Sequence, residues 1–163
     1  MGTASIINYV DPTARIGKNV KLWHFVYIGR NAVIGDGTVI GSLTHVDYDV
    51  IIGSNCRIEG CVYIPPLTKI GNNVFIGPGV VITNDPYPPS KRLVGVTIED
   101  GAVVCAGSIL KAGIRIGRNS VVGMGSVVTR DVPDDSVVFG SPAQVRYSRA
   151  EYNSRRAIWE RGA

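Results

Sequence analysis

An aliphatic residue recurs at every sixth position from Val10 to Ile82, thirteen times in succession, and this period constrains the fold more than any other feature. A second run in a shifted frame extends from Ile98 to Val128. Six residues match neither the 3.6-residue period of a helix nor the simple alternation of a strand. They suit one short strand followed by one corner, so that three units would close a triangular coil of eighteen residues. The chain is therefore predicted to be an array of stacked repeats.

The predicted corners carry glycine and asparagine, the residues that most readily adopt a left-handed backbone. Two columns repeat at eighteen residues, namely Gly17, Gly35, Gly53 and Gly71, and then Asn19, Gly37, Asn55 and Asn73. The second frame has its own corner column of Gly101, Gly107, Gly113, Asn119, Gly125 and Asp131. Nineteen sides of this kind predict an all-β triangular prism of about six coils.

Composition limits the class of protein. A chain of 163 residues is long enough for one domain with a sizeable core. Three cysteines without a Cys-x-x-Cys pair favour a reducing cytosol. With no membrane-length apolar run and no leader-like start, we expect a cytoplasmic protein without membrane association. The net charge of +4 comes without interleaved aromatic and basic residues, so no nucleic-acid partner is expected.

The hexapeptide frame is interrupted once, between Ile82 and Ile98. Three prolines in this interval bar regular ladder pairing, so a loop spanning about 84–97 should protrude. We divide the chain into a prism domain at 1–146 and a short helical tail at 147–163. Five arginines crowd the C-terminal part, and they form either a solvated helix face or a rim that attracts a polyanionic small molecule.

Three stretches narrow the interpretation. Leu22-Trp23-His24-Phe25 resembles the Trp-His-Phe stretch of nucleotide-sugar amine N-acetyltransferases, and the interval 82–88 resembles their Thr-Asn-Asp-x-Tyr-Pro loop. The interval 121–133, followed by Gly140-Ser141-Pro142-Ala143, resembles the acetyl-CoA-binding end shared by hexapeptide acetyltransferases. With the repeat, these stretches make the chain similar to the left-handed parallel β-helix acyltransferases. The resemblance implies an acetyl-CoA-dependent enzyme and a homotrimer with active sites between neighbouring prisms.

The same resemblance implies N-acetylation of the amino group of a nucleotide-linked sugar, of the UDP- or dTDP-3-amino sugar type. Asn84 at the loop root is the predicted catalytic residue, because its amide would accept a hydrogen bond from the amine and orient the lone pair at the thioester. The alternative for Asn84 is an Asx-type turn that starts the loop. Asp85 would hold a sugar hydroxyl or take up the amine proton, and Tyr87 would stack on the sugar or base. His24 either contacts the substrate or is a structural residue beside Trp23.

Residues for acetyl-CoA are expected in the second frame. Backbone N–H groups of Ala106 or Gly107, and of Met124 one coil on, are candidates for the pantetheine amides and the thioester oxygen. Pro142 belongs to the stretch that resembles the acetyl-CoA-binding end. The cationic candidates for the CoA phosphates are Lys111, Arg130 and Arg146. No metal is expected, since two histidines cannot supply a three-histidine zinc site.

The main alternative is O-acetylation of a sugar or another small hydroxyl acceptor. A hydroxyl needs a general base, most often histidine, whereas an amine needs only to be uncharged. Counting coils places His24 about 19 Å and His45 about 14 Å below the loop root. Neither side chain would then reach chemistry at the loop, which favours the amine acceptor.

Overall fold

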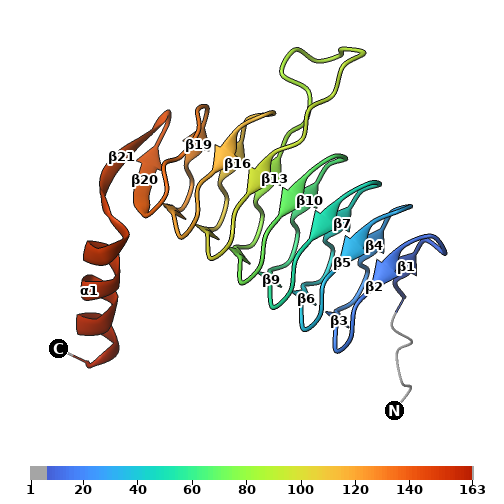
Figure 1. Cartoon of the computed structure of the whole chain (residues 1–163), viewed down its shortest axis with the longest axis horizontal. Coiled ribbons are helices and arrows are strands. Elements are labelled where there is room, and N and C mark those ends of the chain that lie inside the picture. The colour runs from blue at the N-terminus through green and yellow to red at the C-terminus, as the bar shows by residue number, and fades with distance from the viewer. Residues whose placement is uncertain (1–6, 163) are drawn as a thin grey trace.

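The protein folds into a β-solenoid of about seven turns, whose short strands align in three parallel sheets (Figure 1). The structure is a computed structural model that describes residues 7–162. The predicted triangular β-helix is confirmed. It has about one coil more than expected, because β20 (Ser136–Gly140) extends a sheet beyond the last hexapeptide, where the sequence indicated the end of the coils.

Residues of neighbouring coils pair in parallel register along each sheet. They are eighteen apart below the loop, as Tyr27 is from His45, and twenty-eight apart across it, as Val81 is from Ile109. Sheet A consists of β1 (Tyr9–Val10), β4 (Tyr27–Ile28), β7 (His45–Val46), β10 (Tyr63–Ile64), β13 (Val81–Ile82), β16 (Ile109–Leu110) and β19 (Val127–Val128). Sheet B consists of β2 (Arg15–Ile16), β5 (Val33–Ile34), β8 (Ile51–Ile52), β11 (Lys69–Ile70), β14 (Thr97–Ile98) and β17 (Arg115–Ile116). Sheet C consists of β3 (Lys21–Leu22), β6 (Val39–Ile40), β9 (Arg57–Ile58), β12 (Phe75–Ile76), β15 (Val103–Val104), β18 (Val121–Val122), β20 and β21 (Ala143–Ser148).

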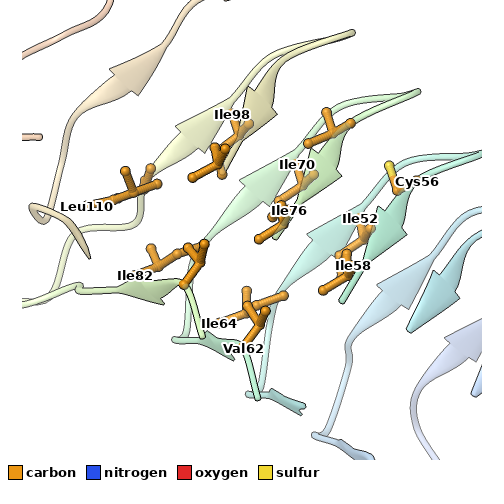
Figure 2. Packing of buried hydrophobic residues seen from close by; sticks show 14 of the residues in the cluster. Ile52, Cys56, Ile58, Val62, Ile64, Ile70, Ile76, Ile82, Ile98 and Leu110 are labelled. Carbon is orange, nitrogen blue, oxygen red and sulfur yellow. The ribbon is translucent and has the colours of Figure 1, made fainter. Parts of the chain in front are cut away.

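The aliphatic residue of each hexapeptide points into the prism and stacks on its equivalent in the next coil. Figure 2 shows these side chains in the middle coils, among them Ile58, Ile76 and Ile82, all of which are buried. Burying one such side chain contributes about 1.5–3 kcal/mol. Buried Thr and Ser side chains donate to backbone carbonyls, as Thr38 Oγ1 does to Gly53 (2.9 Å). The repeat is therefore held together by contacts between neighbouring coils.

The two predicted corner columns differ in their physical role. Asn19, Gly37, Asn55 and Asn73 have positive φ, as predicted. The column that begins at Gly17 does not, and there glycine is required by close approach: a Cβ on Gly35 would lie 2.5 Å from the carbonyl carbon of Gly53. In the second frame, the prediction that Asp131 belongs to the left-handed corner column is also wrong, because its φ is not positive. Asp135 has the positive φ (52°) instead, because the chain leaves the hexapeptide frame after the last coil.

Three features interrupt or end the prism. Residues 83–96 connect β13 to β14 and protrude from it (Figure 1). Strands β20 and β21 form an antiparallel hairpin on the last coil, and α1 (Arg149–Glu160) follows. Ser148 Oγ caps α1 by accepting a hydrogen bond from the Glu151 amide (3.2 Å). Within residues 7–162, no helix combines the length and the apolar character needed to cross a membrane.

Candidate active site

The corners of the prism position the predicted site residues. We call them the B/C corner (residues 17–20 and their repeats), the C/A corner (23–26 and repeats) and the A/B corner (29–32 and repeats) after the sheets that they join. The protruding loop replaces one turn of the A/B corner. Asn84, Asp85, Tyr87, Lys111 and Arg130 therefore belong to the A/B corner, whereas His24, Ala106, Gly107 and Met124 belong to the C/A corner.

Asn84 lies where the loop leaves the prism. Its backbone carbonyl accepts a hydrogen bond from the Val94 amide (2.8 Å), and the preceding Thr83 Oγ1 donates to the carbonyl of Leu110 (3.0 Å). The first bond joins the two ends of the loop, and the second ties its root to β16 in the next coil. The side-chain amide of Asn84 makes no hydrogen bond within residues 7–162, so the Asx-type turn is not formed by this residue.

Asp85 makes that turn instead. Its carboxylate accepts hydrogen bonds from the amide of Tyr87 (2.9 Å) and from the amide and hydroxyl of Ser90 (2.7 and 2.8 Å). These bonds, the Ser90 amide foremost, lower the pKa of the Asp85 carboxyl. The Asp85 carboxylate thus stabilises the loop conformation, and its lowered pKa makes it a poor acceptor for a proton. This argues against its predicted role in taking up the amine proton. Tyr87 projects from the loop with 83 % of its surface exposed.

The C/A corner changes character along the prism. Its positive-φ column begins with Phe25, Leu43 and Cys61 and continues with Gly79, Gly107 and Gly125. A Cβ on any of these three glycines would meet no heavy atom within 4 Å. Large side chains thus cover this corner in the lower coils, and the upper coils leave it open.

The backbone amides of the open part include two without an acceptor. The Gly107 amide donates to the Pro78 carbonyl (2.9 Å) in the ladder between coils. The prediction that this amide is free to bind acetyl-CoA is therefore wrong. The amides of Ala106 and Met124 make no hydrogen bond to any residue of the described chain. Two outward amides one coil apart match what a thioester or pantetheine oxygen requires.

The equivalent amides of the B/C corner are mostly capped. Side-chain oxygens from the next coil accept from the amides of Lys18, Ser54, Asn72 and Arg118, and the acceptors are Asp36 (2.7 Å), Asn72 (2.8 Å), Asp100 (2.7 Å) and Asp134 (3.1 Å). The amides of Asp36 and Asp100 on the same corner have no acceptor within residues 7–162. The hexapeptide turn therefore tolerates both capped and open amides, and what distinguishes the C/A corner is that Ala106 and Met124 lie beside the open glycine column.

The β20–β21 hairpin borders the open corner. Gly123 packs so closely on the hairpin that a Cβ there would lie 2.7 Å from the Cβ of Phe139. Arg146 lies over the Phe139 ring (5.1 Å from its guanidinium carbon to the centroid), and the cis Ser141–Pro142 bond lies at the hairpin turn. Met124, 79 % exposed, is the next residue along the corner. The structure thus brings Met124, Pro142 and Arg146 to one end of the molecule.

The two histidines occupy different surroundings. His24 is exposed on the C/A corner, and its amide approaches Ser42 Oγ (3.3 Å). His45 pairs with Tyr63, which pairs with Val81, so it lies two coils below β13. That height is about 10 Å. The predicted 14 Å was wrong because coils had been counted from the chain start and not along the strand register.

His45 also belongs to a cluster that sequence reasoning missed. Its ring stacks on Tyr27 (4.4 Å between centroids), and its Nε2 lies 3.8 Å from Asp47 Oδ2. Tyr63 Oη donates to the same carboxylate oxygen (3.3 Å). The signal was present in the sequence, since Tyr9, Tyr27, His45 and Tyr63 follow one another at intervals of eighteen residues.

The arginines of the C-terminal helix are partly neutralised. Arg155 pairs with Glu151 (2.6 Å) and Arg156 approaches Glu160 (3.5 Å). Both pairs are exposed. This arrangement favours the solvated helix face over an anion-attracting rim.

Known proteins match most of the chain. The family model for the bacterial transferase hexapeptide (six repeats) matches residues 13–47, 31–66 and 49–84, and the hexapeptide repeat of succinyl-transferase matches 67–112 and 108–130. The galactoside O-acetyltransferase of Lactococcus lactis is 44 % identical over 138 residues, which covers 80 % of this chain and 53 % of that protein. The bifunctional protein GlmU of Brevibacillus brevis is 31 % identical over 137 residues, which covers 84 % of this chain and 25 % of GlmU. The chain thus spans about half the length of the first relative and a quarter of the second.

Solved structures share the fold. The acetyltransferase domain of PglB from Neisseria gonorrhoeae superposes with a TM-score of 0.62 at 21 % identity, covering 85 % of this chain and 54 % of that one. WeeI from Acinetobacter baumannii gives 0.61 at 24 % identity, covering 84 % and 57 %. The PglB domain has also been solved in complex with acetyl coenzyme A, and that structure superposes with a TM-score of 0.60 at 21 % identity, again over 85 % and 54 %.

Proposed function

Since the chain belongs to the bacterial hexapeptide-repeat transferase family, we propose that it transfers the acetyl group of acetyl-CoA to a sugar acceptor. The observation that carries the proposal is the open C/A corner. There the amides of Ala106 and Met124 lack acceptors in the described chain, glycines leave space beside them, and the hairpin with Arg146 closes the end.

The proposed donor site assigns a role to each of these groups. The pantetheine arm lies along the glycine column, and Arg146 faces the phosphates. An open amide, that of Ala106 or of Met124, donates to the thioester oxygen as the acceptor attacks the carbonyl carbon. The carbon–sulfur bond then breaks, CoA leaves as the thiolate, and the acceptor's proton is taken up. Donors of this type typically contribute 10²–10³-fold to kcat.

A hydroxyl acceptor is the better supported of the two acceptor classes. The galactoside O-acetyltransferase is the relative with the greatest identity reported above. A hydroxyl requires a base. His45 beside Asp47 is not positioned for that role at this donor site, because β7 lies three strands below β16 in sheet A, about 14 Å along the prism from Ala106. A neighbouring prism at the same height does not shorten that distance, so a hydroxyl acceptor would use a base other than His45.

An amine acceptor is favoured by one specific observation. The Asn84 side chain, at the root of a loop without histidine, has no hydrogen-bond partner within residues 7–162. It is free to accept from the amino group of a UDP- or dTDP-linked 3-amino sugar and to orient the lone pair. This is the second candidate function.

CoA release distinguishes the candidates. Acetyl-CoA is offered with methyl β-D-galactopyranoside, with UDP- and dTDP-3-amino sugars, and with the 3-hydroxy forms of these nucleotide sugars. The hydroxyl proposal predicts turnover of hydroxyl acceptors that survives in both Asn84→Ala and His45→Gln. The amine proposal predicts turnover of amino sugars alone, which collapses in Asn84→Ala and survives in His45→Gln. No CoA release from any acceptor, together with no binding of acetyl-CoA in calorimetry, would overturn acetyl transfer itself.

We further propose that the active enzyme is a homotrimer with sites between subunits. Within one chain, sheet A separates Asn84, Lys111 and Arg130 from the open amides of the C/A corner. A neighbouring prism at the same height would bring the two corners together. If the acceptor is an amine, so that Asn84→Ala is inactive, co-assembly of Asn84→Ala chains with Ala106→Pro chains tests this, because mixed trimers should contain sites with both residues intact. If the mixture stays as inactive as either variant, the shared site is wrong.

A further inference from the structure

A groove lies over sheet C beside the lower part of the C/A corner. Its walls include Trp23, Ser42, Arg57, Glu59 and Gly60. We call it the Trp23 groove. None of these residues except Trp23, as a neighbour of His24, entered the predicted site.

The repeat explains why the groove exists. Trp23, Gly41 and Glu59 follow one another at intervals of eighteen residues, so they occupy one column of the corner. Gly41 has no side chain, and a Cβ there would lie 2.5 Å from the Gly60 amide nitrogen. The Gly60 backbone fills the space that a Cβ would take, so the column has no side chain between the indole below and the carboxylate above, and the groove lies outside this contact. Trp23 keeps 56 % of its surface exposed, although indole is among the most apolar groups in a protein.

The polar groups around the gap are balanced in charge. Arg57 Nε donates to Glu59 Oε1 (2.5 Å), so the two side chains form a neutral pair that still offers outward donors and acceptors. Ser42 contributes its hydroxyl. The backbone amides of Ser42 and Gly60 have no acceptor in the part of the chain that the structure describes. A neutral pair gives a diphosphate no net attraction, whereas its free donors and acceptors suit hydroxyl groups.

We propose that the Trp23 groove binds a neutral pyranose ring, with one apolar face on the indole and hydroxyls on the Arg57–Glu59 pair and Ser42. The inference rests on the proposed function, because this sugar would be part of the acceptor. The open amides support the link. Gly60 lies two coils below Ala106 in the same column, with Pro78 between them, so the groove lies about 10 Å from the proposed thioester site on one continuous corner.

Fluorescence of Trp23 tests the proposal without any turnover. The chain has two tryptophans, and Trp159→Phe leaves Trp23 as the sole emitter. Methyl β-D-galactopyranoside and methyl β-D-glucopyranoside are titrated alone, without acetyl-CoA, beside UDP alone. At least one glycoside should change the emission saturably, and UDP should not. Arg57→Gln and Glu59→Gln should each weaken that response at least tenfold, whereas Arg15→Gln on sheet B, the matched control, should leave it unchanged.

Three results would overturn the proposal. A response to UDP without a response to either glycoside would mean an anion site. Silence with all three probes would mean that the groove binds no sugar. Protection of Trp23 from iodide quenching before any ligand is added would mean that another copy of the chain covers it. Because binding is read without acetyl-CoA, these results are independent of whether CoA release supports the proposed function.

Discussion

The B/C and C/A corners are built from the same hexapeptide turn, yet their amides differ. On the B/C corner, Asp36, Asn72, Asp100 and Asp134 accept hydrogen bonds from amides of the coil below. On the C/A corner only the His24 amide finds such a side chain, Ser42, at 3.3 Å. Higher up, the residues at the capping position are Gly60, Pro78, Ala106 and Met124. Both corners use the same turn, so the turn forms with or without a cap. The caps therefore add stability at the B/C corner, and their absence at the C/A corner leaves amide donors for a ligand.

Replacing Ala106 by proline should have the largest effect. The substitution deletes one open amide, and Pro78 in the same column shows that the turn accepts proline. Loss of a donor to the thioester oxygen should lower kcat about 10²–10³-fold, with little change in Tm. Steady-state CoA release and thermal denaturation check the two parts.

The matched control is Ser54→Pro on the B/C corner. It deletes an amide that Asn72 caps, so it should lower Tm and leave kcat unchanged. Equal losses of kcat in both proline variants would show that the two corners do not differ in function.

Filling the open column should weaken donor binding. Gly107→Leu places a side chain where nothing lies within 4 Å, and Leu43 in the same column adopts the same positive φ. The KM for acetyl-CoA should rise at least tenfold, and the left-handed backbone should cost about 1–2 kcal/mol. Asn55→Leu on the B/C corner carries the same backbone cost without the rise in KM. An unchanged KM in Gly107→Leu would place the pantetheine arm elsewhere.

Removing a cap should affect stability alone. Asn72→Ala leaves the Ser54 amide to water, and the lost hydrogen bond should destabilise the fold by about 1 kcal/mol. For a chain of this size that corresponds to a fall in Tm of about 2–4 °C. A fall in kcat/KM comparable to that of Ala106→Pro would contradict the purely structural role of this corner.

The smallest effect is expected from acid. Arg115, which hydrogen-bonds to Asp134 (2.6 Å), lowers the pKa of that carboxyl in the folded state. The stabilisation is therefore complete above the unfolded pKa and is lost as the pH falls through the lower folded value. Tm measured from pH 6 to pH 2.5 should fall less steeply for Asp134→Asn than for the natural chain below about pH 4. If Tm falls equally steeply with pH in both proteins, Asp134 does not contribute to the loss of stability in acid.

The fold was predictable because each inward residue, such as Ile58 or Ile76, repeats its environment in every coil. The six-residue period in the sequence therefore places these side chains directly above one another in successive coils. The role of Gly17 and its equivalents was not predictable from local preference. A backbone contact between coils depends on the spacing of the coils, and the φ preference of a single residue carries no information about it.

The site was only partly predictable. The loop root at Asn84 follows directly from the break in the frame. The Met124 amide has no acceptor in the described chain, and its role as a donor to acetyl-CoA stays a prediction. Only the structure shows that the Gly107 amide is already bonded to the Pro78 carbonyl. The His45–Asp47–Tyr63 cluster was missed because its members are adjacent only across coils. How the A/B and C/A corners meet depends on a neighbouring chain.

Amide hydrogen exchange at individual residues tests the difference between the corners most directly. Exchange is followed by NMR with and without acetyl-CoA, in the absence of any acceptor. We predict that the Ala106 and Met124 amides exchange rapidly in the free protein and become protected when acetyl-CoA binds. The capped amides of Ser54 and Asn72 should be protected throughout. Acetyl-CoA that binds without slowing exchange at either Ala106 or Met124 would contradict the assignment of the open corner to the acetyl donor.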